Sequence, residues 1–208
     1  MKYWMLLWLL LTINVLAASR SQGTPGAFDF YVLSLSWSPT YCLINPGKTK
    51  CTEDYGFLLH GLWPQYTKGG WPESCDAQSR LSPTELAKGA LVFSSQALLK
   101  HMWAKHGTCS GLGASGYLDA TDTALAAVKI PQQLEPFNAP NYLHAQEIES
   151  LFSQSNPTMG NPGMAVICKG RVLSEVRVCM SKELRFTNCP DSVKTTCRAG
   201  DIRIPTQR

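Results

Sequence analysis

The sequence predicts a single α+β domain, because it contains both segments with the period of β-strands and segments with the period of helices. The strand-like segments lie toward the two ends of the chain, and most helix-like segments lie between them. The chain has 208 residues, 44% of them hydrophobic, and no internal repeat or low-complexity linker divides it. A chain of this length is expected to form one domain around one core.

The first 18 residues predict a secretory signal peptide. One lysine, Lys2, precedes an uncharged apolar run over residues 3–16, and small residues follow at 17–19. This run is shorter than the roughly 20 apolar residues that span a bilayer, which argues against a membrane anchor. We therefore expect residues 1–18 to be removed and residues 19–208 to fold as one secreted or periplasmic domain.

Eight cysteines follow the predicted signal peptide, and an even number in an exported chain favours disulfides. Cys42 and Cys51 bracket a turn-forming Asn-Pro-Gly triplet, so a local disulfide is expected there. The alternative, a zinc hydrolase, lacks support because the chain has neither a C-x-x-C nor an H-E-x-x-H motif. We expect no metal. The net charge of +4 suits an anionic partner without requiring one.

Four segments predict strands. Residues 28–37 predict a half-buried strand, because large apolar side chains alternate with small or polar ones after Phe30. Ser38-Pro39-Thr40 is expected to end this strand. Residues 57–60 predict a short strand with His60 at its C-terminal end. Residues 164–168 and 172–180 are rich in β-branched side chains and flank a glycine turn, which predicts a hairpin.

Four other segments predict helices. Ser82, Pro83 and Glu85 form a strong start signal for a helix over 83–90. Residues 96–106 are rich in helix formers and precede Gly107, which can adopt the left-handed conformation that ends a helix. Further helices are expected over 117–128 and 145–152.

Three of the four histidines lie in two short stretches, residues 60–65 and 101–109. Histidine takes up and releases protons near neutral pH, so two imidazoles on opposite sides of a substrate can act as base and acid. Positions 101, 102, 105 and 106 share one helix face, so His101, Lys105 and His106 are expected to project toward one place. His144 lies outside both stretches and is expected at the surface.

With these residues in order, the chain resembles the ribonuclease T2 family of exported endoribonucleases. The resemblance covers the opening at 28–42, the motifs at 60–64 and 101–109, the segment 71–75 and the segment 166–179. It implies a central antiparallel sheet with packed helices. It also implies three disulfides, Cys75 with Cys109, Cys168 with Cys197 and Cys179 with Cys189, which the Cys42–Cys51 pair would complete.

The resemblance implies cleavage of single-stranded RNA without cofactor or metal, with the ribose 2′-hydroxyl as nucleophile. The product would be a 2′,3′-cyclic phosphate, later hydrolysed to a 3′-phosphate. The catalytic residues would be His106 as base and His60 as acid, with His101 and Lys105 contacting the phosphate. We expect low base specificity and a monomer.

Aromatic and amide side chains near the first motif predict where a base would bind. Exposed bases of single-stranded RNA stack on aromatic rings, and Trp63 is the first candidate, although it could equally be a core residue. The Gln65 amide can both donate and accept hydrogen bonds to a base. Trp71 and Trp103 are expected to pack against the sheet.

One position departs from the family pattern. The family usually has a glutamate directly after the first histidine of the second motif, whereas this chain has Met102, which cannot carry a charge. We expect this change to slow turnover rather than abolish it. The alternative is a catalytically inactive exported RNA-binding protein or toxin.

Overall fold

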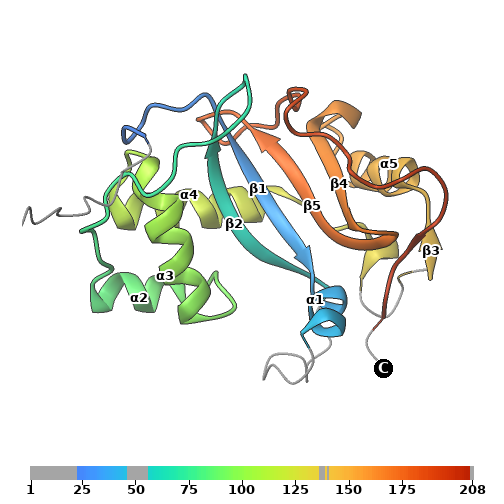
Figure 1. The fold of residues 1–208 in the computed structure, drawn as a ribbon, viewed down its shortest axis with the longest axis horizontal. Helices are drawn as coiled ribbons and strands as arrows, with labels where there is room; N and C mark the ends of the chain where they lie inside the picture. The colour runs from blue at the N-terminus through green and yellow to red at the C-terminus, as the bar shows by residue number, and fades with distance from the viewer. Residues whose placement is uncertain (1–22, 46–55, 136–138, 140, 207–208) are drawn as a thin grey trace, which may run out of the picture.

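The structure is a computed structural model that describes residues 23–45, 56–135, 139 and 141–206. A curved sheet crosses the middle of the molecule, with helices at both sides of it (Figure 1). The predicted signal peptide, residues 1–18, lies outside the described residues, and so does Cys51. The signal peptide and the Cys42–Cys51 disulfide therefore stay predictions. Within the described residues, no helix is both long and apolar enough to cross a membrane.

Four strands form the main, antiparallel part of the sheet in the order β2-β1-β5-β4. They are β1 (Phe30–Trp37), β2 (Phe57–Gln65), β4 (Met164–Lys169) and β5 (Val172–Met180). Two short strands that the sequence did not predict, β3 (Tyr142–Leu143) and β6 (Ile202–Arg203), extend it, and β6 pairs with β5 in parallel. The predicted α+β class with a mainly antiparallel sheet is confirmed.

Strand β1 is buried on both faces, so the prediction of a half-buried strand is wrong. Tyr31 and Leu33 belong to the main core, while Phe30 and Val32 pack in a smaller cluster on the other face. That cluster contains Val193, which follows β5 in the chain. The C-terminal segment therefore covers a face of β1 that its alternating sequence suggested would meet solvent.

A short helix, α1 (Ser38–Ile44), begins where the Ser-Pro-Thr triplet was expected only to end β1. Pro39 lies in its first turn, where a proline costs no hydrogen bond. The side chain of Thr40 donates a hydrogen bond to the backbone oxygen of Leu173 and so joins α1 to β5.

The four predicted helices are present. They are α2 (Pro83–Gly89), α3 (Gln96–Lys105), α4 (Gly113–Ala127) and α5 (Ala145–Ser155). Helix α2 has the predicted capping box between Ser82 and Glu85. Helix α4 begins four residues earlier than predicted. Helices α2, α3 and α4 gather on the β2 side of the sheet, and α5 lies beside β4 (Figure 1).

Gly107 follows α3, but it does not adopt the expected left-handed conformation. It begins a short 3-10 helix, Gly107–Cys109. A Cβ atom at this position would lie 2.4 Å from the ring of Trp103 and 2.8 Å from that of Tyr117. Glycine is therefore required here for close packing of α3 against α4, not for backbone conformation.

The disulfides implied by the family resemblance join Cys75 to Cys109, Cys168 to Cys197 and Cys179 to Cys189. The last two tie the segment after β5 to the hairpin of β4 and β5, which turns at Gly170 with φ of 64°. Disulfides of this kind fit an oxidising compartment.

Candidate active site

The first motif lies inside strand β2 rather than at a strand end. The sequence predicted a strand that ends at His60, but β2 continues through Pro64 to Gln65. A proline is tolerated there because β2 is the edge strand of the sheet, so no further strand needs its missing donor. His60 therefore lies in mid-strand, which corrects its predicted place at the C-terminal end.

His60 is the extra residue of a β-bulge. The pairing of β1 with β2 passes from Ser34 opposite Gly61 to Leu35 opposite Leu59, and leaves His60 without a partner. Bulges change the direction of side chains and occur next to active sites. Here Leu59 and Leu62 both face the core, while the half-buried His60 and Trp63 lie against each other.

The indole of Trp63 contacts both motif histidines. It meets the His60 ring edge-on, with centroids 5.0 Å apart, and is stacked with the His106 ring at 5.4 Å. The two imidazoles, distant in sequence, therefore lie against one side chain. Trp63 therefore has a packing role, and its predicted contact with a base stays a prediction.

His106 caps the C-terminal end of α3, and only 6% of its surface is exposed. Its Nδ1 atom is buried and has no hydrogen-bond partner among the described residues. Burial, followed by the positive charges of Lys105, His101 and His60, lowers the pKa of His106 to about 3. The imidazole is therefore neutral from mildly acidic pH upward and can accept a proton there.

His101 and Lys105 only partly fulfil the expectation of one common face. His101 is exposed and Lys105 is half-buried, whereas Met102 and His106 are buried. Both side chains nevertheless lie near enough to His106 to lower its pKa. The Lys105 ammonium thus makes the edge beside the imidazole positively charged.

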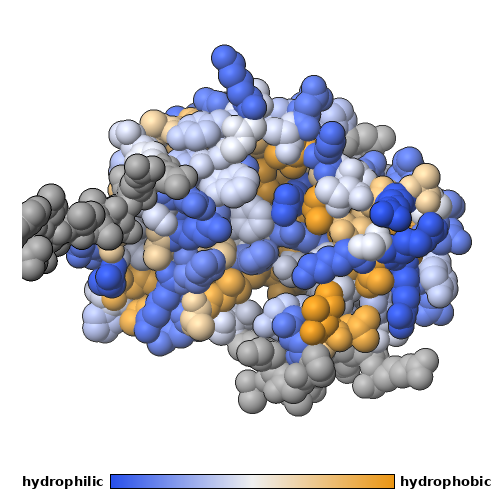
Figure 2. Space-filling view, viewed as in Figure 1, coloured by the Kyte–Doolittle hydropathy of each residue, from blue (hydrophilic) through white to orange (hydrophobic). Residues whose placement is uncertain are grey.

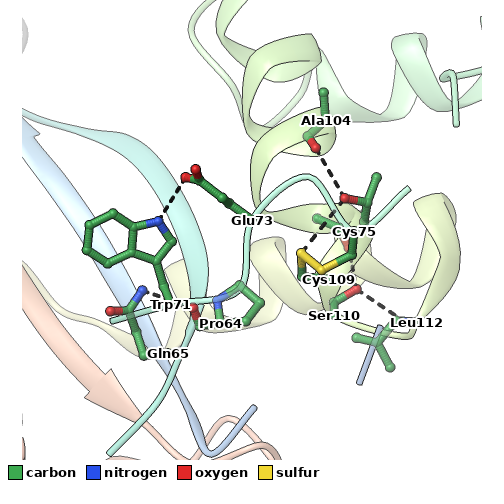
Figure 3. Close-up of a disulfide and its surroundings, with 11 residues drawn as sticks. Pro64, Gln65, Trp71, Glu73, Cys75, Ala104, Cys109, Ser110 and Leu112 are labelled. Carbon is green, nitrogen blue, oxygen red and sulfur yellow. Dashed lines mark hydrogen bonds between the residues drawn. A yellow bond between two sulfur atoms is a disulfide. The ribbon is translucent and has the colours of Figure 1, made fainter. Parts of the chain in front are cut away.

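The segment before α2 holds Lys105 in place. The Lys105 ammonium is 3.5 Å from the Glu73 carboxylate, and the backbone N–H of Ser74 donates to the Lys105 carbonyl at 2.8 Å. Ser74 adopts a φ of 53°, in the left-handed region that favours glycine. The Cys75–Cys109 disulfide fixes the same segment to the 3-10 helix after α3 (Figure 3).

Trp71 is half-exposed, with 50% of its surface accessible, so the prediction that it packs against the sheet is wrong. Its Nε1 donates to Glu73 Oε2 at 3.0 Å, as Figure 3 shows. A turn closed by the Tyr66 N–H and the Gly70 carbonyl brings Trp71 back beside Gln65. Trp103, by contrast, is buried in the core as predicted.

Met102 is buried behind Trp63, and its sulfur accepts a hydrogen bond from Trp63 Nε1 at 3.4 Å. A Cβ atom at Gly61 would lie 2.6 Å from that sulfur. Glycine in the first motif therefore lets α3 approach β2 closely enough for Met102 to reach the indole.

Two charged residues of β5 complete the site, and the sequence did not single them out. The Glu175 carboxylate is 3.2 Å from His60 Nδ1 and 3.2 Å from Arg177 Nη2. The Arg177 guanidinium in turn lies 5.3 Å from the Trp63 ring centroid. The only sequence signal was that residues 175 and 177 are charged and share one face of a strand whose other residues are mainly apolar.

A cavity of about 750 Å³ adjoins His60. Its walls come from α1, β2, the start of α3 and β5, and Figure 2 shows the surface hollowed between α1 and α3. His60 and Glu175 lie on its wall, so the cavity is on the His60 side of the site. Among the described residues, no three His, Cys, Asp or Glu side chains form a group that could hold a metal ion.

Comparison with known proteins decides the family. The family model of the Ribonuclease T2 family matches residues 28–189, which include both histidine motifs. The chain belongs to the ribonuclease T2 family. A ribonuclease of Aeromonas hydrophila is 46% identical over 97 residues, and this match spans 46% of the present chain and 44% of that protein. Ribonuclease DdI of Dictyostelium discoideum is 27% identical, over 92% of this chain and 94% of its own.

Solved structures of T2-type proteins share the fold. An RNase-related protein from Calystegia sepium superposes with a TM-score of 0.70 at 26% identity, over 87% of this chain and 98% of that one. RNase NT, solved in complex with 5′-AMP, superposes with a TM-score of 0.66 at 24% identity, over 86% of this chain and 98% of its own.

Proposed function

We propose that this T2-family chain is a metal-independent endoribonuclease that cleaves single-stranded RNA with low base specificity. The observation that carries the proposal is the contact of both His60 and His106 with Trp63. RNA supplies its own nucleophile, the 2′-hydroxyl. The protein must therefore move two protons and stabilise the charge on the phosphate, which imidazole and ammonium groups can do without a metal.

In this mechanism His106 is the base and His60 the acid. Neutral His106 accepts the proton of the 2′-hydroxyl, whose oxygen attacks phosphorus, and His60 gives a proton to the departing 5′-oxygen. The phosphorus–5′-oxygen bond breaks, and a 2′,3′-cyclic phosphate is left. Hydrolysis to the 3′-phosphate reverses these roles, with water in place of the leaving oxygen. Lys105 and His101 stabilise the phosphate charge from the positively charged edge beside His106.

The differing environments of the two imidazoles support this assignment. His106 is buried and has a lowered pKa, which suits a group that must be unprotonated. His60 is half-exposed, and its Nδ1 lies 3.2 Å from the Glu175 carboxylate. Two imidazoles in such contrasting surroundings can take different roles, one as base and one as acid.

RNA bases have two further candidate contacts. Gln65 Nε2 donates to the Pro64 carbonyl, and its amide oxygen has no partner among the hydrogen bonds of the described residues. The exposed indole of Trp71 lies beside it. Contacts of this kind tolerate several bases, because every base has a face that can stack. We also propose that the mature protein is an exported monomer.

The test is an assay of the mature protein on single-stranded RNA with EDTA present, with products identified by ³¹P NMR. We expect a 2′,3′-cyclic phosphate to appear first and a 3′-phosphate later. His60→Ala should abolish cleavage, and His144→Ala, which changes an exposed histidine outside the site, should not. If the wild type forms no cyclic phosphate from acidic to neutral pH, the proposal is wrong.

An inactive RNA-binding protein is the second candidate, and the observation in its favour is the uncharged, buried Met102 in the second motif. The two functions differ in their response to His60→Ala. A binding protein would keep its RNA affinity and its biological effect in this variant, whereas an effect that depends on cleavage would be lost.

A further inference from the structure

Glu175 is a buried carboxylate with 7% of its surface exposed, and each of its two oxygens has a partner. Oε1 faces His60 Nδ1 and Oε2 faces Arg177 Nη2, both at 3.2 Å. Buried carboxylates are costly unless they are paired, and the pairing is what makes this one tolerable. The Glu175 carboxylate therefore contacts His60 and Arg177 instead of solvent.

The contact decides which nitrogen of His60 is available to substrate. An ionised carboxylate only accepts hydrogen bonds, so Nδ1 must donate to it, and Nε2 is left as the atom that can give a proton away. Building on the proposed function, we propose that Glu175 is the positioning residue for His60. Its carboxylate, held by Arg177, fixes the imidazole in the orientation and tautomer that protonate the leaving 5′-oxygen.

The β-bulge at His60 explains why side-chain contacts are needed to orient its imidazole. Because His60 has no pairing partner in β1, the sheet register does not fix the direction of its side chain. Two side-chain contacts fix it instead, namely Glu175 at Nδ1 and the Trp63 indole against the ring. Arg177 contacts both Glu175 and Trp63, so it holds these two residues together.

The titratable and charged groups around His60 come from three elements. Glu175 and Arg177 lie on β5, His106 lies at the end of α3, and Lys169 of β4 lines the same cavity. Of the carboxylates in the part of the chain that the structure describes, Glu175 is the one paired with His60. Removing its charge therefore takes away the carboxylate paired with the ring, while Arg177 and Lys169 remain.

Two variants separate charge from hydrogen bonding. Glu175→Gln keeps the shape and an acceptor but removes the charge, and Glu175→Met removes both. Glu183→Gln is the matched control, because Glu183 is an exposed carboxylate of the same chain that also pairs with an arginine, Arg185. Circular dichroism and thermal unfolding select variants that fold.

The first measurement is independent of catalysis. Two-bond ¹⁵N–¹H NMR spectra of histidine-labelled protein, assigned with His→Ala variants, report the tautomer of each ring. We expect neutral His60 to carry its hydrogen on Nδ1 in the wild type and in Glu183→Gln, and to become a mixture of tautomers in Glu175→Met. An unchanged His60 spectrum in a folded Glu175→Met protein would overturn the proposal.

The second measurement uses two substrates that differ in their need for an acid. RNA has an alkoxide leaving group that must be protonated, whereas a nucleoside 3′-aryl phosphate releases an aryl oxide that need not be. For Glu175→Gln we expect kcat on RNA to fall about 10- to 100-fold with little change in KM. Turnover of the aryl ester should fall less than about threefold, because general-acid help is small there.

The results distinguish this inference from the function on which it rests. Equal losses on RNA and on the aryl ester would show a merely structural role for Glu175 and would overturn the inference while the enzyme remains a ribonuclease. If the wild type cleaves neither substrate, the proposed function fails, and the NMR spectra alone decide whether Glu175 positions His60.

Discussion

The imidazole of His106 lies stacked on the indole of Trp63, 5.4 Å from it between ring centroids, and only 6% of the His106 surface is exposed. The burial that makes this contact also lowers the pKa of His106 to about 3. A histidine that stays neutral in acid can act as a base, but its low pKa destabilises the folded protein when the pH falls. The low pKa of His106 should therefore affect both the stability and the rate.

Stability should fall as the pH is lowered through the range between the unfolded and the folded pKa of His106. Between about 6.5 and about 3 the unfolded chain binds a proton at this residue that the folded protein does not, so the free energy of unfolding decreases with decreasing pH. From neutral pH to about pH 4.5 this loss is about 2–3 kcal/mol. Urea unfolding of His106→Gln should show a pH dependence smaller by that amount.

Ala104→Gln is the control, because Ala104 is exposed on the same helix and carries no titratable group. Its unfolding should keep the pH dependence of the wild type. An equal pH dependence in wild type and His106→Gln would mean that the His106 pKa is not lowered by burial.

The rate should respond to Lys105 in a defined direction. Its charge is one cause of the lowered His106 pKa, so Lys105→Gln should raise that pKa and move the acid limb of kcat/KM to higher pH, by about half a unit to one unit. The rate itself should also fall, because a phosphate contact is lost. Lys100→Gln, at an exposed position of the same helix, should leave the limb where it is.

Trp71 should contribute to RNA binding and little to stability. Stacking of one base on an aromatic ring contributes about 1–3 kcal/mol, so Trp71→Ala should raise KM for a short oligoribonucleotide about tenfold. Its unfolding free energy should change by about 0.5 kcal/mol at most, because the ring is half-exposed. Trp71→Phe keeps a ring but loses the bond to Glu73, and it should retain most of the affinity. A KM unchanged in Trp71→Ala would exclude the contact.

Local sequence signals predicted helices α2 to α5 but not α1, whose residues were expected only to end β1. The start of α2 could be predicted because its capping box is formed by neighbours in the chain, Ser82 and Glu85. The strands of the β4–β5 hairpin could be predicted for the same reason, since a glycine turn joins them directly. Signals of this kind require nothing beyond a few adjacent residues.

What could not be predicted depends on contacts between distant segments. The continuation of β2 through Pro64 follows from its place at the sheet edge, which no local pattern reveals. The same holds for the pairing of Glu175 with His60, which are 115 residues apart. The motifs identified the two histidines, but the carboxylate that contacts one of them comes from a strand that the sequence marked only as part of the core.

Met102→Glu tests whether the second motif lacks a carboxylate that catalysis needs. The new side chain would lie where the Met102 sulfur now accepts the hydrogen bond of Trp63 Nε1, close to the indole that both histidines contact. A negative charge there should stabilise protonated imidazoles and speed up cleavage of RNA about tenfold. Burial of the carboxylate should lower the unfolding free energy by about 1–3 kcal/mol.

Met102→Gln, which is polar but uncharged, separates the effect of charge from that of hydrogen bonding and should not accelerate the reaction. If Met102→Glu folds but cleaves no faster than the wild type, the methionine is not what limits this site, because a weakened enzyme would gain from the restored charge.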